Sequence, residues 1–288
     1  MRNELRDSRR FLIHVSKTQP TKANMETPSF DLLGIRIQAL SKLDLVEIIT
    51  QAVKSRARYI IGNHNLHSLY TWFHEPRMRE FYSLADYTHI DGMSLVVLGR
   101  LFGLPFKRQH RTGYMDFLPL LAEESVKHEW RIFYLGSKPG IAEKAARVLR
   151  KRYEGLQILT HHGHFDTNQK GLANQEVLAE IKAYAPDILM VGMGMPRQEV
   201  WILENQKEIT GRAIFCCGAL LDYVAGEIPT PPRWIGSLGF EWLYRLISEP
   251  ARLWQRYLLE PWSVMGGLMR AYIGTAHSRR HAGAVRND

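Results

Sequence analysis

Short apolar runs alternate with stretches of helical apolar spacing along most of this chain. Between about residues 30 and 226, the order of an apolar run, a turn and a helical stretch repeats at least five times. Because a strand that is followed by a crossover helix pairs in parallel with a later strand, this rhythm predicts a parallel sheet with helices on both faces. We therefore predict a Rossmann-like, mostly parallel α/β domain over residues 28–228, with helices on both faces of its sheet.

The clearest unit in this pattern lies at residues 185–201. Residues 188–191 form an apolar run typical of a strand buried on both faces of a parallel sheet. Gly192 and Gly194 allow a sharp turn after this run, and Pro196 suits the first turn of a helix. A strand, a glycine turn and a helix N-terminus are predicted, which together make a favourable place for a diphosphate.

Two interpretations of this turn stay open. It lacks the third glycine of the dinucleotide-binding fingerprint, so its spacing alone is a weak signal. In one interpretation Gly192, Gly194 and Gln198 contact an anionic substrate. In the other the segment is a tight turn, and Gln198 and Glu199 are exposed to solvent on the helix.

A second glycine turn and a basic loop are further candidates for phosphate contact. Gly136 and Ser137 follow another predicted strand and offer backbone N–H groups to an anion, although this is not a Walker loop. Residues 107–113 are rich in basic side chains, among them Arg111. A run of charges is more often a solvated surface, and this alternative stays open for the loop.

Polar side chains follow two other predicted strands. Asn63 and Asn65 lie at the end of one, and Asp91 lies at the end of the next. Because the carboxyl ends of parallel strands meet at one edge of a sheet, these side chains are expected to face the same crevice as Gly194. Each has a structural alternative. Either asparagine can cap the helix that follows, and Asp91 can be an N-cap instead of a general base.

The histidine-rich segment at residues 161–166 is a weaker candidate. Three histidines and Asp166 suggest a metal, but their spacing matches no known site. An Asp-X-Asp triplet, which commonly holds a metal-bound diphosphate, does not occur in the sequence. We therefore predict neither a metal nor a cofactor.

The chain changes character at residues 226–234, where three prolines mark a boundary. Over residues 233–272, arginines are interleaved with four of the seven tryptophans. Basic residues among aromatic ones suit the interface of an anionic membrane, whereas the alternative is a helical pair that packs its aromatic side chains onto the sheet. Arg233, Arg245 and Arg252 are the candidates for substrate contact here.

Four segments follow from these boundaries. They are a flexible leader at residues 1–27, the α/β domain at 28–228, a helical membrane-docking appendage at 229–275 and a flexible tail at 276–288.

Charge and cysteine content narrow the choice of partners. With 38 basic and 29 acidic residues the chain carries a formal charge of +9, which suggests an anionic partner. The basic residues are spread over several loops without a recognised nucleic-acid module, so we predict no nucleic-acid partner. Its two cysteines are adjacent, at Cys216 and Cys217, which favours a reducing cytoplasmic setting. No stretch reaches the roughly 18 to 20 apolar residues of a membrane span, so a membrane would be met from one side.

Four blocks of sequence together resemble the WecG/TagA/CpsF glycosyltransferases, glycosyltransferase family 26. They are the strand-end tip at residues 63–65, the turn at 90–92, the Gly-Met-Gly-Met-Pro-Arg-Gln-Glu-Val-Trp block at 192–201, and the tail at 218–253. The resemblance covers about residues 30–260.

This resemblance implies a metal-independent, inverting transfer of a sugar from a UDP-sugar to a saccharide carried on a polyprenyl diphosphate. It implies that Asp91 is the base and that Gln198 lies in the active site. It also implies that the arginine-rich appendage docks on an anionic membrane and completes the site. A cytoplasmic enzyme, peripheral on the inner face of the plasma membrane, is the resulting expectation.

The sequence departs from the family pattern at Asn63, where Thr is common, and at Thr230, where Arg is common. The donor therefore stays open among UDP-glucose, UDP-N-acetylmannosamine and its uronic acid. We predict UDP-glucose, in exopolysaccharide or other envelope-glycan assembly, because the tip and the proline-rich segment differ from the amino-sugar enzymes. The alternatives are transfer of N-acetylmannosamine or its uronic acid, or a non-catalytic Rossmann-like nucleotide-binding protein.

Overall fold

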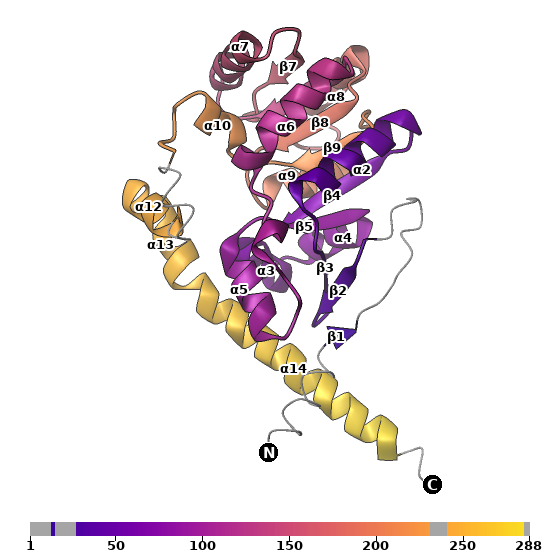
Figure 1. The fold of residues 1–288 in the computed structure, drawn as a ribbon, viewed down its shortest axis with the longest axis vertical. Helices are drawn as coiled ribbons and strands as arrows, with labels where there is room; N and C mark the ends of the chain where they lie inside the picture. The colour runs from indigo at the N-terminus through magenta and orange to yellow at the C-terminus, as the bar shows by residue number, and fades with distance from the viewer. Residues whose placement is uncertain (1–12, 15–26, 231–240, 285–288) are drawn as a thin grey trace.

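The computed structural model describes residues 13–14, 27–230 and 241–284 of the 288-residue chain (Figure 1). Its strands are β1 (Ile13–His14), β2 (Ser29–Leu32), β3 (Ile35–Gln38), β4 (Tyr59–His64), β5 (Tyr87–Ile90), β6 (Arg131–Gly136), β7 (Gln157–His161), β8 (Ile188–Gly192) and β9 (Ala213–Cys216). Its helices are α2 (Lys42–Lys54), α3 (Leu66–His74), α4 (Pro76–Leu84), α5 (Met93–Leu101), the 3-10 helix η1 (Arg108–His110), α6 (Tyr114–Lys127), α7 (Ile141–Arg152), α8 (Leu172–Tyr184), α9 (Arg197–Asn205), α10 (Leu220–Val224), α12 (Glu241–Ser248), α13 (Pro250–Leu258) and α14 (Glu260–Ala284).

Six strands form the main sheet, in the order β5-β4-β9-β8-β6-β7. Every pair of neighbours in it is parallel. The strands are short, and all five residues of β8 are buried, as expected for a sheet covered on both faces. The predicted Rossmann-like α/β fold is confirmed.

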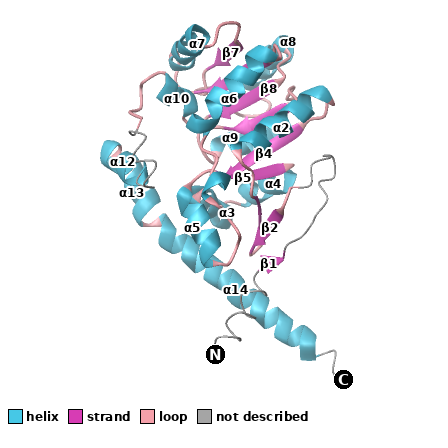
Figure 2. Ribbon diagram, viewed as in Figure 1, coloured by secondary structure: helices cyan, strands magenta, loops and turns pink. Residues whose placement is uncertain are grey.

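Alternate residues of each strand fill two separate cores, because successive side chains point to opposite faces of a sheet. Tyr59 and Ile61 of β4 pack with apolar residues of α2, α6 and α7. Ile60, between them, packs with residues of α4, α8 and α9. Figure 2 shows these helices on either side of the strands. This double burial fixes the sheet and hence the position of every strand end.

A third core joins the beginning and the end of the chain. Phe30 of β2 and Leu69 of α3 belong to it together with Val264 and Leu268 of α14. β2 and β3 pair as an antiparallel hairpin with Gly34, at a φ of +93°, in its turn. β1 lies within the stretch predicted as a leader and pairs with β2, whereas residues 1–12 and 15–26 lie outside the described part.

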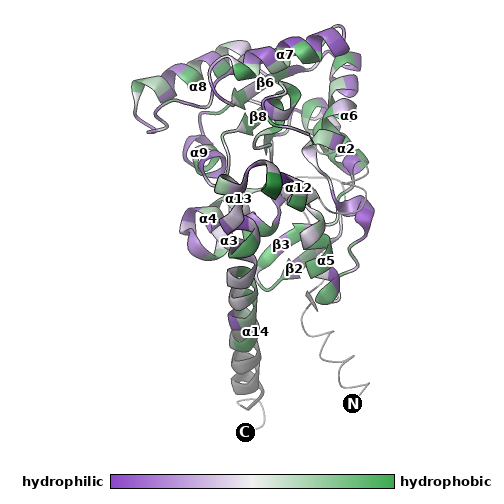
Figure 3. Cartoon of the chain, turned by 90° about the vertical axis from the view of Figure 1, so that its left-hand side faces the viewer, coloured by the Kyte–Doolittle hydropathy of each residue, from purple (hydrophilic) through white to green (hydrophobic). Residues whose placement is uncertain are grey.

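The C-terminal helices follow one another along one side of the molecule, and α14 extends away from the sheet (Figures 1 and 3). A Cβ atom on Gly267 of α14 would stand only 2.8 Å from the ring of Phe73, so glycine lets α14 pack closely on α3. α14 continues to Ala284 and so includes most of the stretch predicted as a flexible tail. Alanine and arginine, which recur there, favour a helix. Among the described helices, none has the length and apolar character of a membrane span.

Candidate active site

The strands of the main sheet bring most of the candidate residues to one edge. Asn63 lies near the end of β4, Asp91 directly follows β5, and Gly136 and Gly192 end β6 and β8. Because these strands are parallel, all four residues lie at the carboxyl edge of the sheet. β4 and β9 stand between β5 and β8, so Asp91 and Gly192 are about 14 Å apart at the usual strand spacing.

Asp91 is partly buried and is held by its neighbours on β4. Its backbone N–H donates to the carbonyl of His64 at 2.8 Å, and its Oδ2 accepts from Asn63 Nδ2 at 3.3 Å. The residue that caps α5 is Gly92. Asp91 therefore does not take the N-cap position that was its structural alternative, and its carboxylate belongs to the strand edge.

Asn65 both caps a helix and acts on the Asp91 carboxyl group. Its Oδ1 accepts from the backbone N–H of Ser68 at 3.0 Å, and the Ser68 hydroxyl accepts from the Asn65 N–H at 2.9 Å, which makes a capping box for α3. The Asn65 side chain also lies close enough to Asp91 to lower the pKa of that carboxyl group. The helix cap thus fixes a donor beside the carboxylate.

Three arginines from two distant parts of the chain act on this carboxylate. Burial raises the pKa of Asp91 above its ordinary value, and Arg245, Arg111 and Arg256 oppose that rise. Arg111 comes from the basic loop, which pairs with β5 next to Ile90. It also lies 3.8 Å from the Asp116 carboxylate. A carboxylate with a raised pKa accepts a proton more readily than an ordinary one. The guanidinium groups around it favour negative charge at the same place.

The appendage brings two of these arginines to the sheet edge. Arg245 of α12 lies over the ring of Tyr223 in α10, with its guanidinium carbon 5.1 Å from the ring centroid. Arg256 of α13 is partly buried, and burial lowers its pKa. Arg252 lies on the same helix, α13, and Arg233 lies outside the described residues.

Two of the candidate glycines are required for packing between strand ends. A Cβ atom on Gly192 would stand 2.3 Å from Tyr134 Oη and 2.5 Å from the carbonyl oxygen of Gly218. On Gly136 it would stand 2.3 Å from the carbonyl oxygen of Gly192. Contacts this short do not occur between real atoms, so these glycines allow neighbouring backbones to approach each other.

Ser137 takes part in a network at the same place. Its N–H donates to the Gly192 carbonyl at 3.3 Å, and its hydroxyl donates to Asp222 Oδ2 at 3.1 Å. The helix that follows begins only at Ile141, after Gly140. The N–H group of Ser137 is therefore engaged within the protein.

Gly194 differs from the other glycines of the turn. Its φ is +80°, and a Cβ atom placed on it would meet no described atom within 4 Å. Glycine is favoured here by backbone conformation, and the space beside it is open. Of the three glycines, this is the one whose surroundings suit approach of a ligand.

Gln198 and Glu199 are buried, which overturns the alternative that they are exposed on the helix. Gln198 Nε2 donates to Glu199 Oε1 at 2.8 Å, and Gln198 Oε1 accepts from the Gly218 N–H at 3.2 Å. α9 begins at Arg197, directly after the turn, and its first residues point into the core. The side chains of this block thus connect the turn after β8 with the turn after β9.

Two other segments do not extend the site. His64, which lies between Asn63 and Asn65, is buried against Tyr82, and burial lowers its pKa to about 3. The histidine-rich segment directs His164 Nδ1 to the Ser137 carbonyl at 3.1 Å. Over the described part of the chain, no three His, Cys, Asp or Glu residues are grouped so that they could hold a metal.

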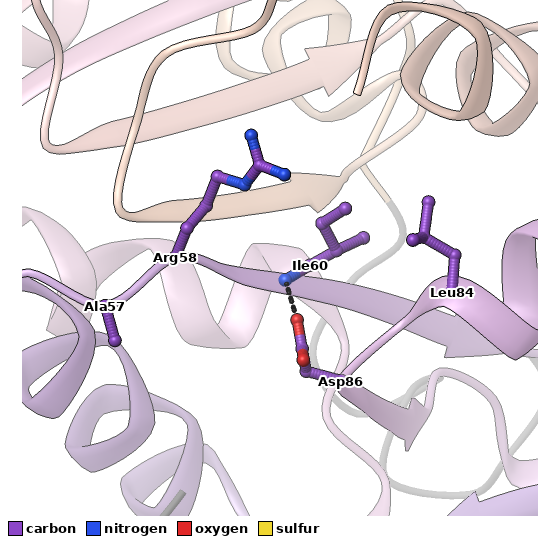
Figure 4. Close-up of a pocket in the computed structure, with 5 residues that line it drawn as sticks. All are labelled: Ala57, Arg58, Ile60, Leu84 and Asp86. Carbon is purple, nitrogen blue, oxygen red and sulfur yellow. Dashed lines mark hydrogen bonds between the residues drawn. The ribbon is translucent and has the colours of Figure 1, made fainter. Parts of the chain in front are cut away.

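A hollow of about 430 Å³ lies at the other edge of the sheet (Figure 4). Arg58 and Asp86 line it, and Asp86 Oδ2 accepts from the Ile60 N–H at 2.8 Å. Asp86 precedes β5 and Asp91 follows it, so the two stand roughly 16 Å apart at about 3.3 Å per residue. The hollow is therefore remote from the candidate site.

The chain matches a known protein family over most of its length. The model of the glycosyl transferase WecG/TagA/CpsF family matches residues 30–278. The chain belongs to this family. The match confirms the resemblance found in the four sequence blocks of this glycosyltransferase. The matched region includes both the sheet and the C-terminal helices.

The glycosyltransferase is similar to Staphylococcus aureus proteins named N-acetylglucosaminyldiphosphoundecaprenol N-acetyl-beta-D-mannosaminyltransferase. Those of strains MW2 and NCTC 8325 / PS 47 are each 27% identical to it over 230 residues, which is 79% of this chain and 87% of the relative. That of strain MRSA252 is 26% identical over the same length.

Three residues near the carboxyl edge of the sheet in this glycosyltransferase were not among the site candidates predicted from the sequence. They are Asp222, which accepts from Ser137, Glu199, which accepts from Gln198, and Arg256, which acts on Asp91. Arg256 had a signal, because it follows Arg245 and Arg252 at helical spacing. Glu199 was visible only as part of a motif, and the position of Asp222 depends on how the turns pack.

Proposed function

We propose that this glycosyltransferase transfers N-acetylmannosamine from a UDP-activated donor to N-acetylglucosamine carried on a polyprenyl diphosphate. The names of the S. aureus relatives support this donor and acceptor. They favour N-acetylmannosamine as the transferred sugar, whereas the sequence alone led us to expect glucose. The observation that carries the proposal is the Asp91 carboxylate, held at the sheet edge and faced by arginines from the loop and the appendage.

In the proposed reaction Asp91 takes the proton from the acceptor hydroxyl while that oxygen attacks the anomeric carbon of the donor. A bond from the acceptor oxygen to the anomeric carbon forms, the bond from that carbon to the diphosphate breaks, and UDP leaves with the electron pair. One base is sufficient for such an inverting step. The raised pKa of Asp91 suits this role, because a more basic carboxylate accepts a proton more readily.

The departing diphosphate needs positive charge, which the chain can supply. Arg111, Arg245 and Arg256 lie close enough to Asp91 to act on its charge. Guanidinium groups bind phosphate oxygens through charge-assisted hydrogen bonds. The open turn at Gly194 and the start of α9 are the proposed contact for the donor, with Gln198 beside them. Asn63, Ser137, Arg233 and Arg252 remain proposed contributors to the same pocket.

The C-terminal helices are proposed to dock on an anionic membrane, on its cytoplasmic face. Exposed apolar side chains follow one another along them: Trp242, Ile247, Trp254, Leu258, Leu259, Trp262, Met265, Met269 and Ile273. Trp262 is 78% exposed, which is unusual for so large an apolar group in water. Apolar groups of this kind next to arginines suit a lipid interface, where the acceptor lipid resides.

A donor panel tests the proposal. The full chain is offered UDP-N-acetylmannosamine, its uronic acid, UDP-glucose and UDP-N-acetylglucosamine, each with N-acetylglucosamine diphosphate on a polyprenyl chain, and the product mass is measured. We expect one N-acetylhexosamine to be added from UDP-N-acetylmannosamine, at a rate well above the other donors. Preferential addition of a hexose from UDP-glucose would contradict the proposed donor, and UDP binding without any transfer would contradict the proposed reaction.

A further inference from the structure

Glu199 is a buried carboxyl group that the proposed reaction does not use. It lies in the first turn of α9 and is 0% exposed. A buried carboxylate is costly, because the protein interior replaces its hydration poorly, and burial raises the pKa of Glu199 to about 7. An apolar side chain of the same size would usually be less costly at such a position. The cost of Glu199 calls for a compensating role.

The contacts of Glu199 indicate what that role is. One carboxyl oxygen, Oε1, accepts from Gln198 Nε2 at 2.8 Å. The other end of the same amide, Gln198 Oε1, accepts from the Gly218 N–H at 3.2 Å. A backbone N–H only donates and an ionised carboxylate only accepts, so the two partners admit one orientation of the Gln198 amide. Without Glu199 the amide would lose the partner that fixes its NH2 end.

The surroundings of Glu199 point to the same edge of the sheet. Cys216 of β9 lies close enough to the Glu199 carboxyl group to influence its pKa. Tyr82 is close enough for the charge of Glu199 to raise the pKa of the Tyr82 phenol. Tyr82 donates to the carbonyl of Asn63 at 2.9 Å, and the Asn63 side chain donates to Asp91. Through these neighbours Glu199 is linked both to the turn that precedes Gln198 and to the strand end that holds Asp91.

We propose that Glu199 is a positioning residue, which fixes the side-chain amide of Gln198 in one orientation and so holds the turns after β8 and β9 together at the edge of the site. Glu199 acts through Gln198 and does not itself touch substrate. The inference rests on the proposed function in one respect only, namely that the fixed amide matters for sugar transfer.

A mutant cycle on the full chain tests this role. Glu199→Met keeps the length of the side chain but removes the acceptor, and we expect it to lower kcat about tenfold or more, as for loss of a hydrogen bond to a charged group. Glu199→Gln retains an oxygen that can accept and should restore most of the rate. In a Gln198→Ala background, Glu199→Met should change kcat by less than about twofold, because the group it positions is gone. Equal losses in both backgrounds would overturn the proposal.

A control and a second measurement separate this inference from the transfer reaction. Glu204→Gln, on the same helix but paired at the surface with Arg77, should leave kcat unchanged. The side-chain amide resonance of Gln198, assigned by its loss in Gln198→Ala, should titrate with a midpoint near pH 7 in the parent and not in Glu199→Gln. A Gln198 amide resonance that is the same in Glu199→Met as in the parent would overturn the positioning role, because the hydrogen bond from Gln198 Nε2 to Glu199 Oε1 would then not fix the amide. If no donor is transferred, the proposed function fails, and this resonance still decides the role of Glu199.

Discussion

The glycines at 192 and 194 are two residues apart, and substitution of each by alanine should have a different consequence. In Gly192→Ala the new Cβ atom would lie 2.3 Å from Tyr134 Oη and 2.5 Å from the Gly218 carbonyl oxygen. An ordinary contact needs about 3.4 Å or more, so the backbones after β8 and β9 must separate by about 1 Å. Overpacking of a core costs about 1–3 kcal/mol, and an obstacle that is partly backbone favours the upper end.

In Gly194→Ala the new Cβ atom meets no described atom, so only the backbone conformation is penalised. A φ of +80° costs a residue with a Cβ atom about 1–2 kcal/mol. The methyl group would, however, point into the open space proposed for the donor. We therefore expect Gly192→Ala to be the more destabilised protein, and Gly194→Ala to be the one with the larger loss of UDP affinity relative to its loss of stability.

Urea unfolding and calorimetric titration with UDP measure the two effects on the same preparations. Gly266→Ala, in α14 with open space beside it, serves as a control and should be stabilised by up to about 1 kcal/mol, because alanine favours a helix. If Gly192→Ala unfolded within about 0.5 kcal/mol of the parent, the close approach of the strand ends would be refuted. If Gly194→Ala bound UDP as the parent does, the proposed donor contact at this turn would be wrong.

Three other outcomes are expected. The Glu199 carboxyl binds its proton more tightly in the folded chain, with a pKa of about 7 against 4.5, so the stability it contributes is complete below about pH 4.5 and is lost as pH rises through 7. Glu199→Gln should therefore gain about 3 kcal/mol relative to the parent between pH 4 and pH 8 in urea unfolding, and a constant difference would exclude a buried titrating carboxyl. Sugar transfer should be lost as pH falls through the raised pKa of Asp91. Because Arg245 lowers that pKa, Arg245→Gln should move the loss of kcat/KM to higher pH. A move to lower pH would contradict the placement of Arg245 beside Asp91. The double variant Trp254→Ala with Trp262→Ala should bind anionic vesicles at least about tenfold more weakly, since each tryptophan buries apolar surface in the interface. Unchanged vesicle binding, together with an unchanged melting temperature, would show that these two residues are not part of the proposed membrane surface.

The order of strands and helices was readable from the sequence because most of it depends on local pattern. The run that became β8 is apolar throughout, and the helix start predicted at Pro196 corresponds closely to α9, which begins at Arg197. Glycine turns and prolines marked where these elements end. The sheet order was not readable, because it depends on which strands lie side by side across long distances in the chain.

The site was predictable in part for the same reason. Parallel strands place their carboxyl ends together, so Asn63 and Asp91 could be assigned to one edge before their contact was known. What the sequence could not distinguish was whether a glycine serves a ligand or a neighbouring backbone. Gly192 meets Tyr134 and Gly218, whereas Gly194 faces open space, and only the packing of the turns separates these two cases.

The burial of side chains was the least predictable feature. Gln198 and Glu199 are polar and follow a turn, which is typical of a solvated helix start, yet both are buried. Their hydrogen bonds to each other and to the Gly218 N–H compensate for the loss of water. Such compensation arises from residues about 20 positions apart and leaves no local pattern in the sequence.

Replacement of Asp91 by asparagine tests most directly the claim that this carboxylate is the base. The change keeps the shape of the side chain and an oxygen that can accept the hydrogen bond from Asn63, so the free energy of unfolding should change by no more than about 1–2 kcal/mol. Transfer of the sugar to the lipid-linked acceptor should fall by about 10²–10⁴-fold, as for loss of a general base. If Asp91→Asn turned over within a fewfold of the parent rate, measured by product mass under the same conditions, Asp91 would not be the base.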